Sequence, residues 1–177
     1  MTKAFVLTIV FLLLAVVQTS FFASLPGLLA YAPLVVACGV YLRQQVQERS
    51  GALWIAGFGI FLDLLAIPSF PFETISYAAA AIVATLTAGR VFSNRSWYGL
   101  LACGASSVAA LGITRAIVLW AVSLQRPERV SWAAFGETFL WNMILLPVML
   151  SLCFAFAGRI RSFLRTTFMI SRDRETL

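Results

Sequence analysis

The chain has 177 residues, of which 61% are apolar and 11% charged, whereas soluble domains have about 45–50% apolar and about 25% charged residues. This composition, with a mean hydropathy of +0.93, excludes a water-soluble globule. The sequence has no histidine, which excludes His-based acid–base catalysis and His-ligated metal sites. Its two aspartates, Asp63 and Asp173, lie in an apolar run and in the charged tail, which argues against a paired-aspartate protease.

Six apolar runs follow one another, most of them close to the roughly 20 residues needed to cross a 30 Å hydrocarbon core. In chain order they are Ala4–Phe22, Leu28–Leu42, Gly51–Ile67, Phe72–Val91, Trp97–Leu124 and Trp132–Ala157. The second run is short and contains Pro33, so we expect its helix to extend past Arg43, whose side chain can snorkel. The sequence therefore predicts an all-α integral membrane protein, with a six-transmembrane-helix bundle in residues 1–157.

The distribution of Lys and Arg predicts the orientation of the bundle. With six crossings, alternate loops assign two positive residues to one side, Arg126 and Arg129. They assign ten to the other side: Lys3, Arg43, Arg49, Arg90, Arg95, Arg159, Arg161, Arg165, Arg172 and Arg174. The side richer in Lys and Arg is normally cytoplasmic. We therefore expect both termini in the cytoplasm, and a basic amphipathic tail at residues 158–177 lying in the membrane interface.

Polar side chains inside the spans are costly and need a structural or functional reason. The predicted topology places these residues in the outer half of the bundle or near its midplane: Gln18, Asp63, Glu73, Arg115, Glu137 and Asn142. One interpretation is an outward-open polar cavity that binds a ligand or a partner's transmembrane segment. The other is internal pairing, in which Arg115 pairs with Asp63 or Glu137, while Glu73 interacts with the positive N-terminus of its own helix.

Small residues and prolines mark further structural positions. Gly57 and Gly59 lie in the third span, where small residues let helix backbones approach closely. Pro147 interrupts the sixth span, so we expect a kink there and a carbonyl near residue 143 that is satisfied by Asn142 or a neighbour. The three cysteines lie singly in apolar runs, which indicates small core residues and no metal site.

Two parts of the sequence resemble the rod shape-determining protein MreD family. The first part joins a Tyr-Ala-Pro element and a short apolar run to a Gly-rich segment that ends in Asp-Leu. The second is an Asn-x-x-x-x-Pro element with a basic exit. The residues concerned are Tyr31–Pro33, Gly51, Gly57–Leu64, Trp141–Pro147 and Arg159–Arg165. The chain departs from the family pattern after Asp63, where many members have a Gly-containing segment and this chain has Pro68–Glu73.

The resemblance implies a non-enzymatic scaffold subunit of the bacterial cell-elongation machinery in the cytoplasmic (inner) membrane. Its implied partners are MreC, and also MreB, RodA and the transpeptidase of the elongation complex, together with membrane lipid. No cofactor, metal or nucleic acid is expected.

The same resemblance implies a fold like that of the substrate-binding subunits of energy-coupling-factor vitamin transporters, and such a subunit is the alternative function. It would need an outward-facing pocket, and the acidic excess around Arg115 would favour a cationic ligand. Its usual Ala-x-x-x-Ala docking face is missing from the first span, where Val, Leu, Ile and Phe lie between Ala4 and Ala15.

Overall fold

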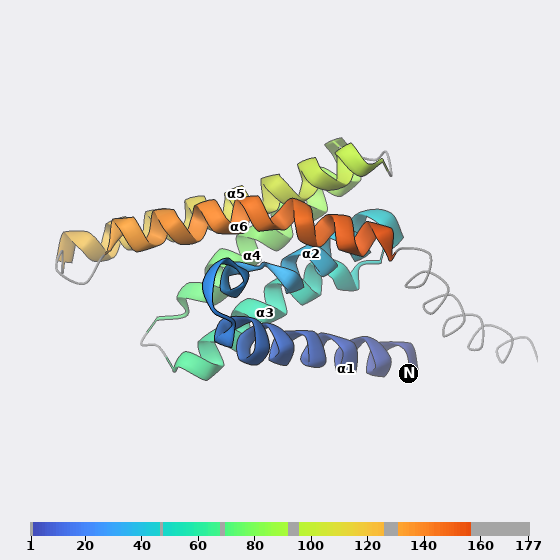
Figure 1. The fold of residues 1–177 in the computed structure, drawn as a ribbon, viewed down its shortest axis with the longest axis horizontal. Coiled ribbons are helices and arrows are strands. Elements are labelled where there is room, and N and C mark those ends of the chain that lie inside the picture. Colours follow the sequence, from blue (N-terminus) through green and yellow to red (C-terminus); the bar gives the residue numbers. More distant parts are fainter. Residues whose placement is uncertain (1, 47, 68–69, 92–95, 126–130, 157–177) are drawn as a thin grey trace, which may run out of the picture.

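The computed structural model describes residues 2–46, 48–67, 70–91, 96–125 and 131–156. The predicted tail at residues 158–177 and the two positive residues assigned to the outer side, Arg126 and Arg129, lie outside the described residues. The described part is all-helical, with no strand (Figure 1).

The helices of the described part run in antiparallel order along one bundle (Figure 1). The α-helices are α1 (Thr2–Val16), α2 (Leu34–Tyr41), α3 (Ser50–Ala66), α4 (Phe72–Leu86), α5 (Trp97–Gln125) and α6 (Trp132–Ala155). Three of them continue as short π-helical segments, which are η1 (Val17–Phe22), η3 (Leu42–Val46) and η4 (Thr87–Val91). A 3-10 segment, η2 (Gly27–Tyr31), precedes α2.

Four helices of the described part are long and apolar enough to cross a membrane, judged by length and composition. They cover Ala4–Phe22, Phe72–Val91, Trp97–Leu124 and Trp132–Ala155, and the first three coincide with predicted runs. The helix α3 is also apolar, but it has only 17 residues.

The second predicted run is not a continuous helix, and this prediction is wrong in its first part. Residues Gly27–Tyr31 form a 3-10 segment, and α2 begins only at Leu34. The break follows from Pro33, which lacks an N–H group and disfavours a helical conformation at Ala32, whose ψ is 120°. At its other end the helix does continue past Arg43, as η3.

The broken segment forms the centre of the core. α2 contacts α1, α3, α5 and α6, and Val35, Val36, Ala37 and Val40 are almost completely buried. α3, α4, α5 and α6 pack against one another in chain order around it. α1 lies at the periphery and packs mainly against α2 and α3 among the described α-helices. The shortest α-helix is thus the most enclosed one.

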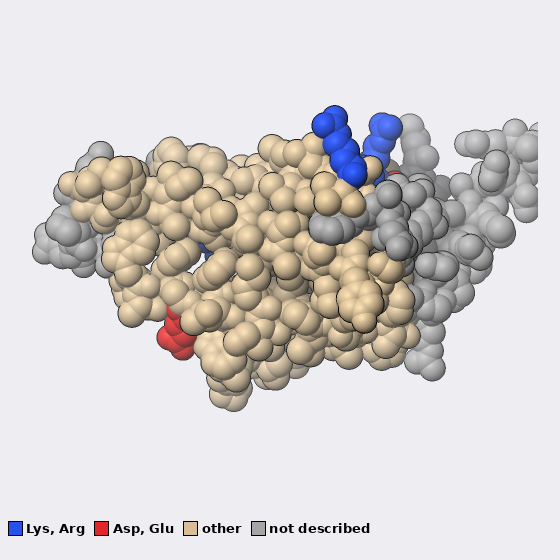
Figure 2. All heavy atoms as spheres, turned by 90° about the horizontal axis from the view of Figure 1, so that it is seen from above, with Lys and Arg blue, Asp and Glu red and all other residues tan. Residues whose placement is uncertain are grey.

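The outer surface of the bundle is mostly apolar. Large exposed apolar side chains occur on every long helix, including Phe5 of α1, Ile82 of α4, Ile117 of α5 and Leu140 of α6. Figure 2 shows a mostly uncharged face, with most of the visible Lys and Arg atoms toward one end and a small group of Asp or Glu atoms on the other half of the face. The first residues of α1 and the last residues of α6 lie toward the same end (Figure 1). A long, mostly uncharged surface with basic residues near one end suits a bundle in a bilayer.

All three cysteines belong to the core, as predicted. Cys103 and Cys153 are buried, and Cys38 is partly buried against the same core. The sulfur atoms of Cys38 in α2 and Cys153 in α6 are 4.0 Å apart.

This proximity predicts a selective cross-link between α2 and α6. Mild copper–phenanthroline oxidation of the detergent-solubilised protein should join Cys38 to Cys153, because a small shift brings the sulfur atoms to bonding distance. Thiol counting after denaturation should fall from three free thiols to one, and peptide mass spectrometry should identify the pair. Cys103→Ala should leave the cross-link intact and Cys38→Ala should abolish it. A cross-link through Cys103 in place of Cys38–Cys153 would contradict the proximity of Cys38 to Cys153.

Candidate functional site

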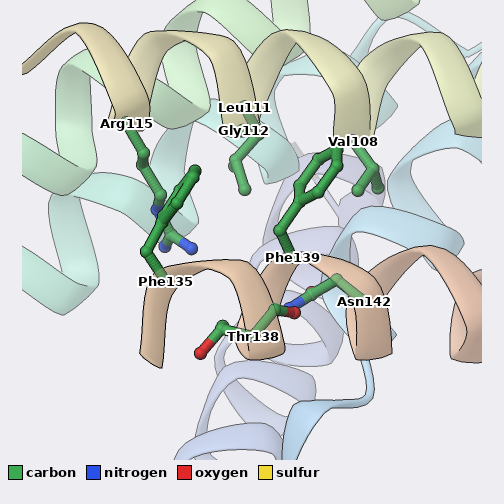
Figure 3. Close-up of a pocket in the computed structure, with 8 residues that line it drawn as sticks. All are labelled: Val108, Leu111, Gly112, Arg115, Phe135, Thr138, Phe139 and Asn142. Carbon is green, nitrogen blue, oxygen red and sulfur yellow. The ribbon is translucent and has the colours of Figure 1, made fainter. Parts of the chain in front are cut away.

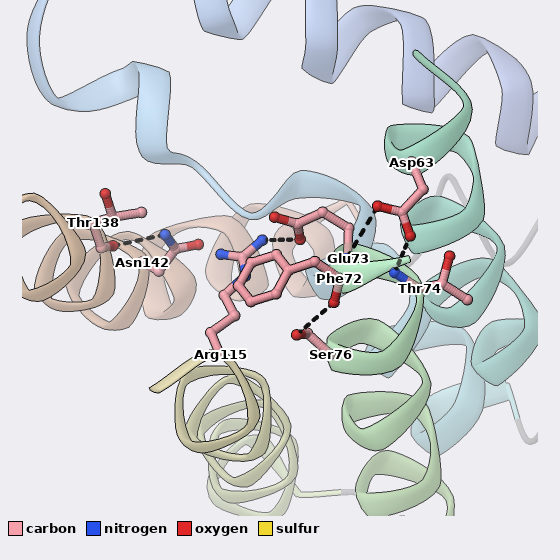
Figure 4. Close-up of polar contacts among 8 residues, drawn as sticks. All are labelled: Asp63, Phe72, Glu73, Thr74, Ser76, Arg115, Thr138 and Asn142. Carbon is pink, nitrogen blue, oxygen red and sulfur yellow. Dashed lines mark hydrogen bonds and ion pairs between the residues drawn. The ribbon is translucent and has the colours of Figure 1, made fainter. Parts of the chain in front are cut away.

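The charged residues inside the bundle meet between α4 and α5. The Arg115 guanidinium on α5 forms an ion pair with the Glu73 carboxylate in the first turn of α4 (Figure 4). The two side chains are only 16% and 24% exposed. The predicted pairing of Arg115 with Asp63 or Glu137 is therefore wrong, and Glu73, expected to serve its own helix end, is the partner.

An aromatic ring lies beside the guanidinium. Arg115 Cζ lies 5.5 Å from the centroid of the Tyr77 ring, a distance at which a cation is attracted to the ring face. Tyr77 was not among the residues singled out from the sequence. Its position four residues after Glu73 was the available signal, because residues at this spacing share one face of a helix.

Asp63 takes the role that the sequence had suggested for Glu73. Its two carboxylate oxygens accept hydrogen bonds from the backbone N–H groups of Glu73, at 3.1 Å, and Thr74, at 2.7 Å (Figure 4). These are the second and third residues of α4, whose N-terminal N–H groups have no partner within the helix. Asp63 is thus the cap of α4, supplied by the end of α3.

The exchange of roles follows from Pro71. It occupies the N-cap position of α4 and has no side-chain oxygen, so no local side-chain cap is present. Asp63 lies in the last turn of α3, directly before the short connection to α4, and its carboxylate can therefore reach across that connection. With the helix end satisfied by Asp63, Glu73 is available to turn toward α5.

Replacing Asp63 should weaken the start of α4. Asp63→Ala leaves two N–H groups without an acceptor, and we expect a loss of about 1–2 kcal/mol in the free energy of unfolding. Titration with SDS in mixed micelles, followed by tryptophan fluorescence, measures this loss. Asp63→Asn keeps one acceptor oxygen and should lose less. Glu137→Ala, at an exposed position of α6, is the control with little change; an equal loss for it would contradict the capping role.

Gln18 caps the N-terminus of α2 in the same way. Its Oε1 accepts a hydrogen bond of 2.7 Å from the backbone N–H of Val35, the second residue of α2, whose N-cap residue Pro33 again offers no side-chain acceptor. α2 begins part-way along the bundle (Figure 1). A buried N–H group without an acceptor is costly, so Gln18 stabilises the start of this short helix.

Asn142 lies beside a small cavity between α5 and α6. Its Nδ2 donates to the carbonyl of Thr138 at 2.7 Å, so it does not serve the carbonyl near residue 143 as predicted. Asn142, Thr138 and Arg115 line the cavity together with apolar residues (Figure 3): Val108, Leu111, Gly112, Phe135 and Phe139. The cavity has a volume of about 10 Å³, enough for about one water molecule.

The remaining predicted residues have separate positions. Glu137 is exposed on α6 and forms no ion pair with another described residue. Gly59 lies at a close approach of α3 and α4, whereas Gly57 faces Phe11 of α1 at ordinary contact distance. α6 continues through Pro147, which is exposed.

The arrangement fixes helices relative to one another. The structure brings together Asp63 and Arg115 through α4, with Asn142 beside the Arg115 cavity, and places Gln18 and Glu137 elsewhere. Within the described ranges no group of three or more Cys, Asp or Glu side chains is placed to hold a metal ion. Comparison of the chain with family models, with curated proteins and with solved structures found no match.

Proposed function

We propose that this protein is a scaffold subunit of the bacterial cell-elongation machinery, of the MreD type. It would bind MreC and link the MreB cytoskeleton to peptidoglycan synthesis by RodA and its transpeptidase. The proposal includes six membrane segments in the cytoplasmic membrane, with α2 and η3 as a short, enclosed one and with both termini in the cytoplasm. It starts from the resemblance of Gly57–Leu64 and Trp141–Pro147 to that family.

The observation that carries the proposal is the use of the intramembrane polar groups. Asp63 and Gln18 cap helices, and Arg115 is bound by Glu73 and Tyr77. A scaffold needs such internal ties because it transmits force or position through a bundle of fixed shape. The long apolar helix faces are then available for partner transmembrane helices and lipid.

The cavity beside Arg115 favours the scaffold over a vitamin-binding subunit. Small-molecule pockets usually have volumes of about 300–1,000 Å³, whereas this cavity has about 10 Å³. The positive charge that lines it is also neutralised by Glu73.

Depletion of the protein in its native host tests the proposal. We expect rod-shaped cells to become round, and expression of the wild-type chain to restore their shape. Purification in mild detergent should recover MreC with the tagged protein and without an ATPase. Unchanged cell shape together with recovery of an energy-coupling ATPase pair and bound vitamin would overturn the scaffold and establish the transporter subunit.

A further inference from the structure

A groove lies between α1 and α3, at the end of the bundle where α1 begins. Its volume is about 510 Å³, and it has no role in the contacts described above. One wall is a single face of α1, formed by Ala4, Leu7, Thr8 and Phe11, and the other is formed by Leu53 and Trp54 of α3. The spacing of the α1 residues, at i, i+3, i+4 and i+7, keeps this wall continuous along the helix.

The shape of the groove follows from where the two helices touch. Phe11 lies 3.4 Å from the position that a Cβ on Gly57 would occupy, and its ring is 6.1 Å from that of Trp54. These contacts close the groove at its inner end. Toward the beginning of α1 the two helices leave space between them, beside the exposed side chain of Leu53.

The polar groups of the groove are concentrated at its mouth. Glu48, Arg49 and Ser50 form this mouth; Arg49 is exposed, and Glu48 is engaged by other parts of the chain. The hydroxyl of Ser50 is buried and has no hydrogen-bond partner among the described residues, and the hydroxyl of Thr8 donates to the Ala4 carbonyl of its own helix. The groove therefore has a polar mouth with an exposed cation and an apolar interior.

We propose that this groove binds one anionic phospholipid of the cytoplasmic leaflet, with its phosphate at Arg49 and an acyl chain along α1. The inference rests on the membrane orientation proposed above, which places this end of the bundle at the cytoplasmic face. An arginine near the cytoplasmic membrane surface attracts anionic headgroups, and Arg49 is the exposed charge at the mouth of the groove. The first turn of α3 contains no acidic residue and has no side-chain cap, so its positive end adds to the attraction of an anion.

The direction of the groove distinguishes a lipid from the protein's own tail. The apolar walls run along the helix axes, from the polar mouth toward the middle of the bundle, as an acyl chain does below its headgroup. A basic amphipathic segment such as residues 158–177 would instead lie in the plane of the interface. Its positive charges would also meet Arg49 at the mouth of the groove.

Native mass spectrometry of the full chain tests the proposal. The protein is purified in mild detergent and titrated with phosphatidylglycerol or, separately, phosphatidylcholine. We expect one retained phosphatidylglycerol, and at least a fivefold lower retention of phosphatidylcholine. Arg49→Gln should reduce phosphatidylglycerol retention several-fold, whereas Arg90→Gln, at an exposed arginine of η4 outside the groove, should not. Ala4→Trp, which fills the groove from an exposed position, should also reduce retention.

Three results would overturn the lipid site. They are equal losses for Arg49→Gln and Arg90→Gln, equal retention of the two lipids, and binding that appears only after removal of residues 158–177, which would assign the groove to the tail. The test is independent of the scaffold test. One lipid retained without recovery of MreC would support the groove and contradict the scaffold, and the reverse result would contradict the groove alone.

Discussion

Arg115→Gln should lower the free energy of unfolding by about 2–3 kcal/mol, because it leaves the partly buried Glu73 carboxylate without its counter-charge. This value lies below the 3–5 kcal/mol typical of fully buried pairs, since about a fifth of each side chain is still exposed. Titration with SDS in mixed micelles, followed by tryptophan fluorescence, measures the change. Tyr77→Phe should cost much less, because it keeps the aromatic ring against the guanidinium.

A double-mutant cycle identifies the partner of Arg115. Arg115→Gln combined with Glu73→Gln should cost clearly less than the sum of the two single changes, by about 1–2 kcal/mol, because the double variant leaves no charge unpaired. The matched control is Glu137→Gln, which removes an exposed carboxylate from α6 and should add independently to Arg115→Gln. Additive losses with Glu73 and coupling with Glu137 would reverse the assignment made from the structure.

The extent of the long helices could be predicted because it depends on one quantity, the length of the apolar run. An apolar run long enough to cross the membrane forms a helix in order to satisfy its backbone groups, and α4 with η4 ends at Val91 as predicted. The position of the short second segment depends instead on its packing in the core. Hydropathy does not distinguish an apolar residue facing lipid from one facing the core, so the enclosure of α2 by α1, α3, α5 and α6 could not be predicted.

The polar residues could be located but not paired. The predicted topology places Asp63, Glu73 and Glu137 at depths that Arg115 can reach. The choice among them depends on the rotation of each helix and on which helix end lacks a hydrogen-bond acceptor. Pro71 explains why Asp63 does not pair with Arg115, because a proline N-cap leaves α4 dependent on an acceptor from α3. Gln18 and Pro33 repeat the same relation at α2. A proline that begins a membrane helix is therefore a reason to search the preceding helix for its cap.

Gly59→Ala should destabilise the bundle by about 2–3 kcal/mol, whereas Gly57→Ala, two residues earlier, should be neutral or slightly stabilising. A Cβ at Gly59 would lie 2.6 Å from the Glu73 carbonyl oxygen and 2.7 Å from Tyr77 Cβ. Neither atom belongs to a flexible side-chain end, so α3 and α4 must separate. At Gly57 the nearest atom is 3.4 Å away, and alanine is favoured over glycine inside a helix by roughly 0.5–1 kcal/mol. SDS titration of both variants gives the sign of each change.

The same substitution tests whether α4 positions the ion pair. Glu73 and Tyr77, which bind Arg115, are also the residues against which a Cβ on Gly59 would press. Separation of α3 from α4 should therefore move both partners relative to α5. We expect the coupling energy between Arg115 and Glu73 to fall by at least half in the Gly59→Ala background and to be unchanged in the Gly57→Ala background. Full coupling in both would show that the ion pair forms independently of the close approach between α3 and α4.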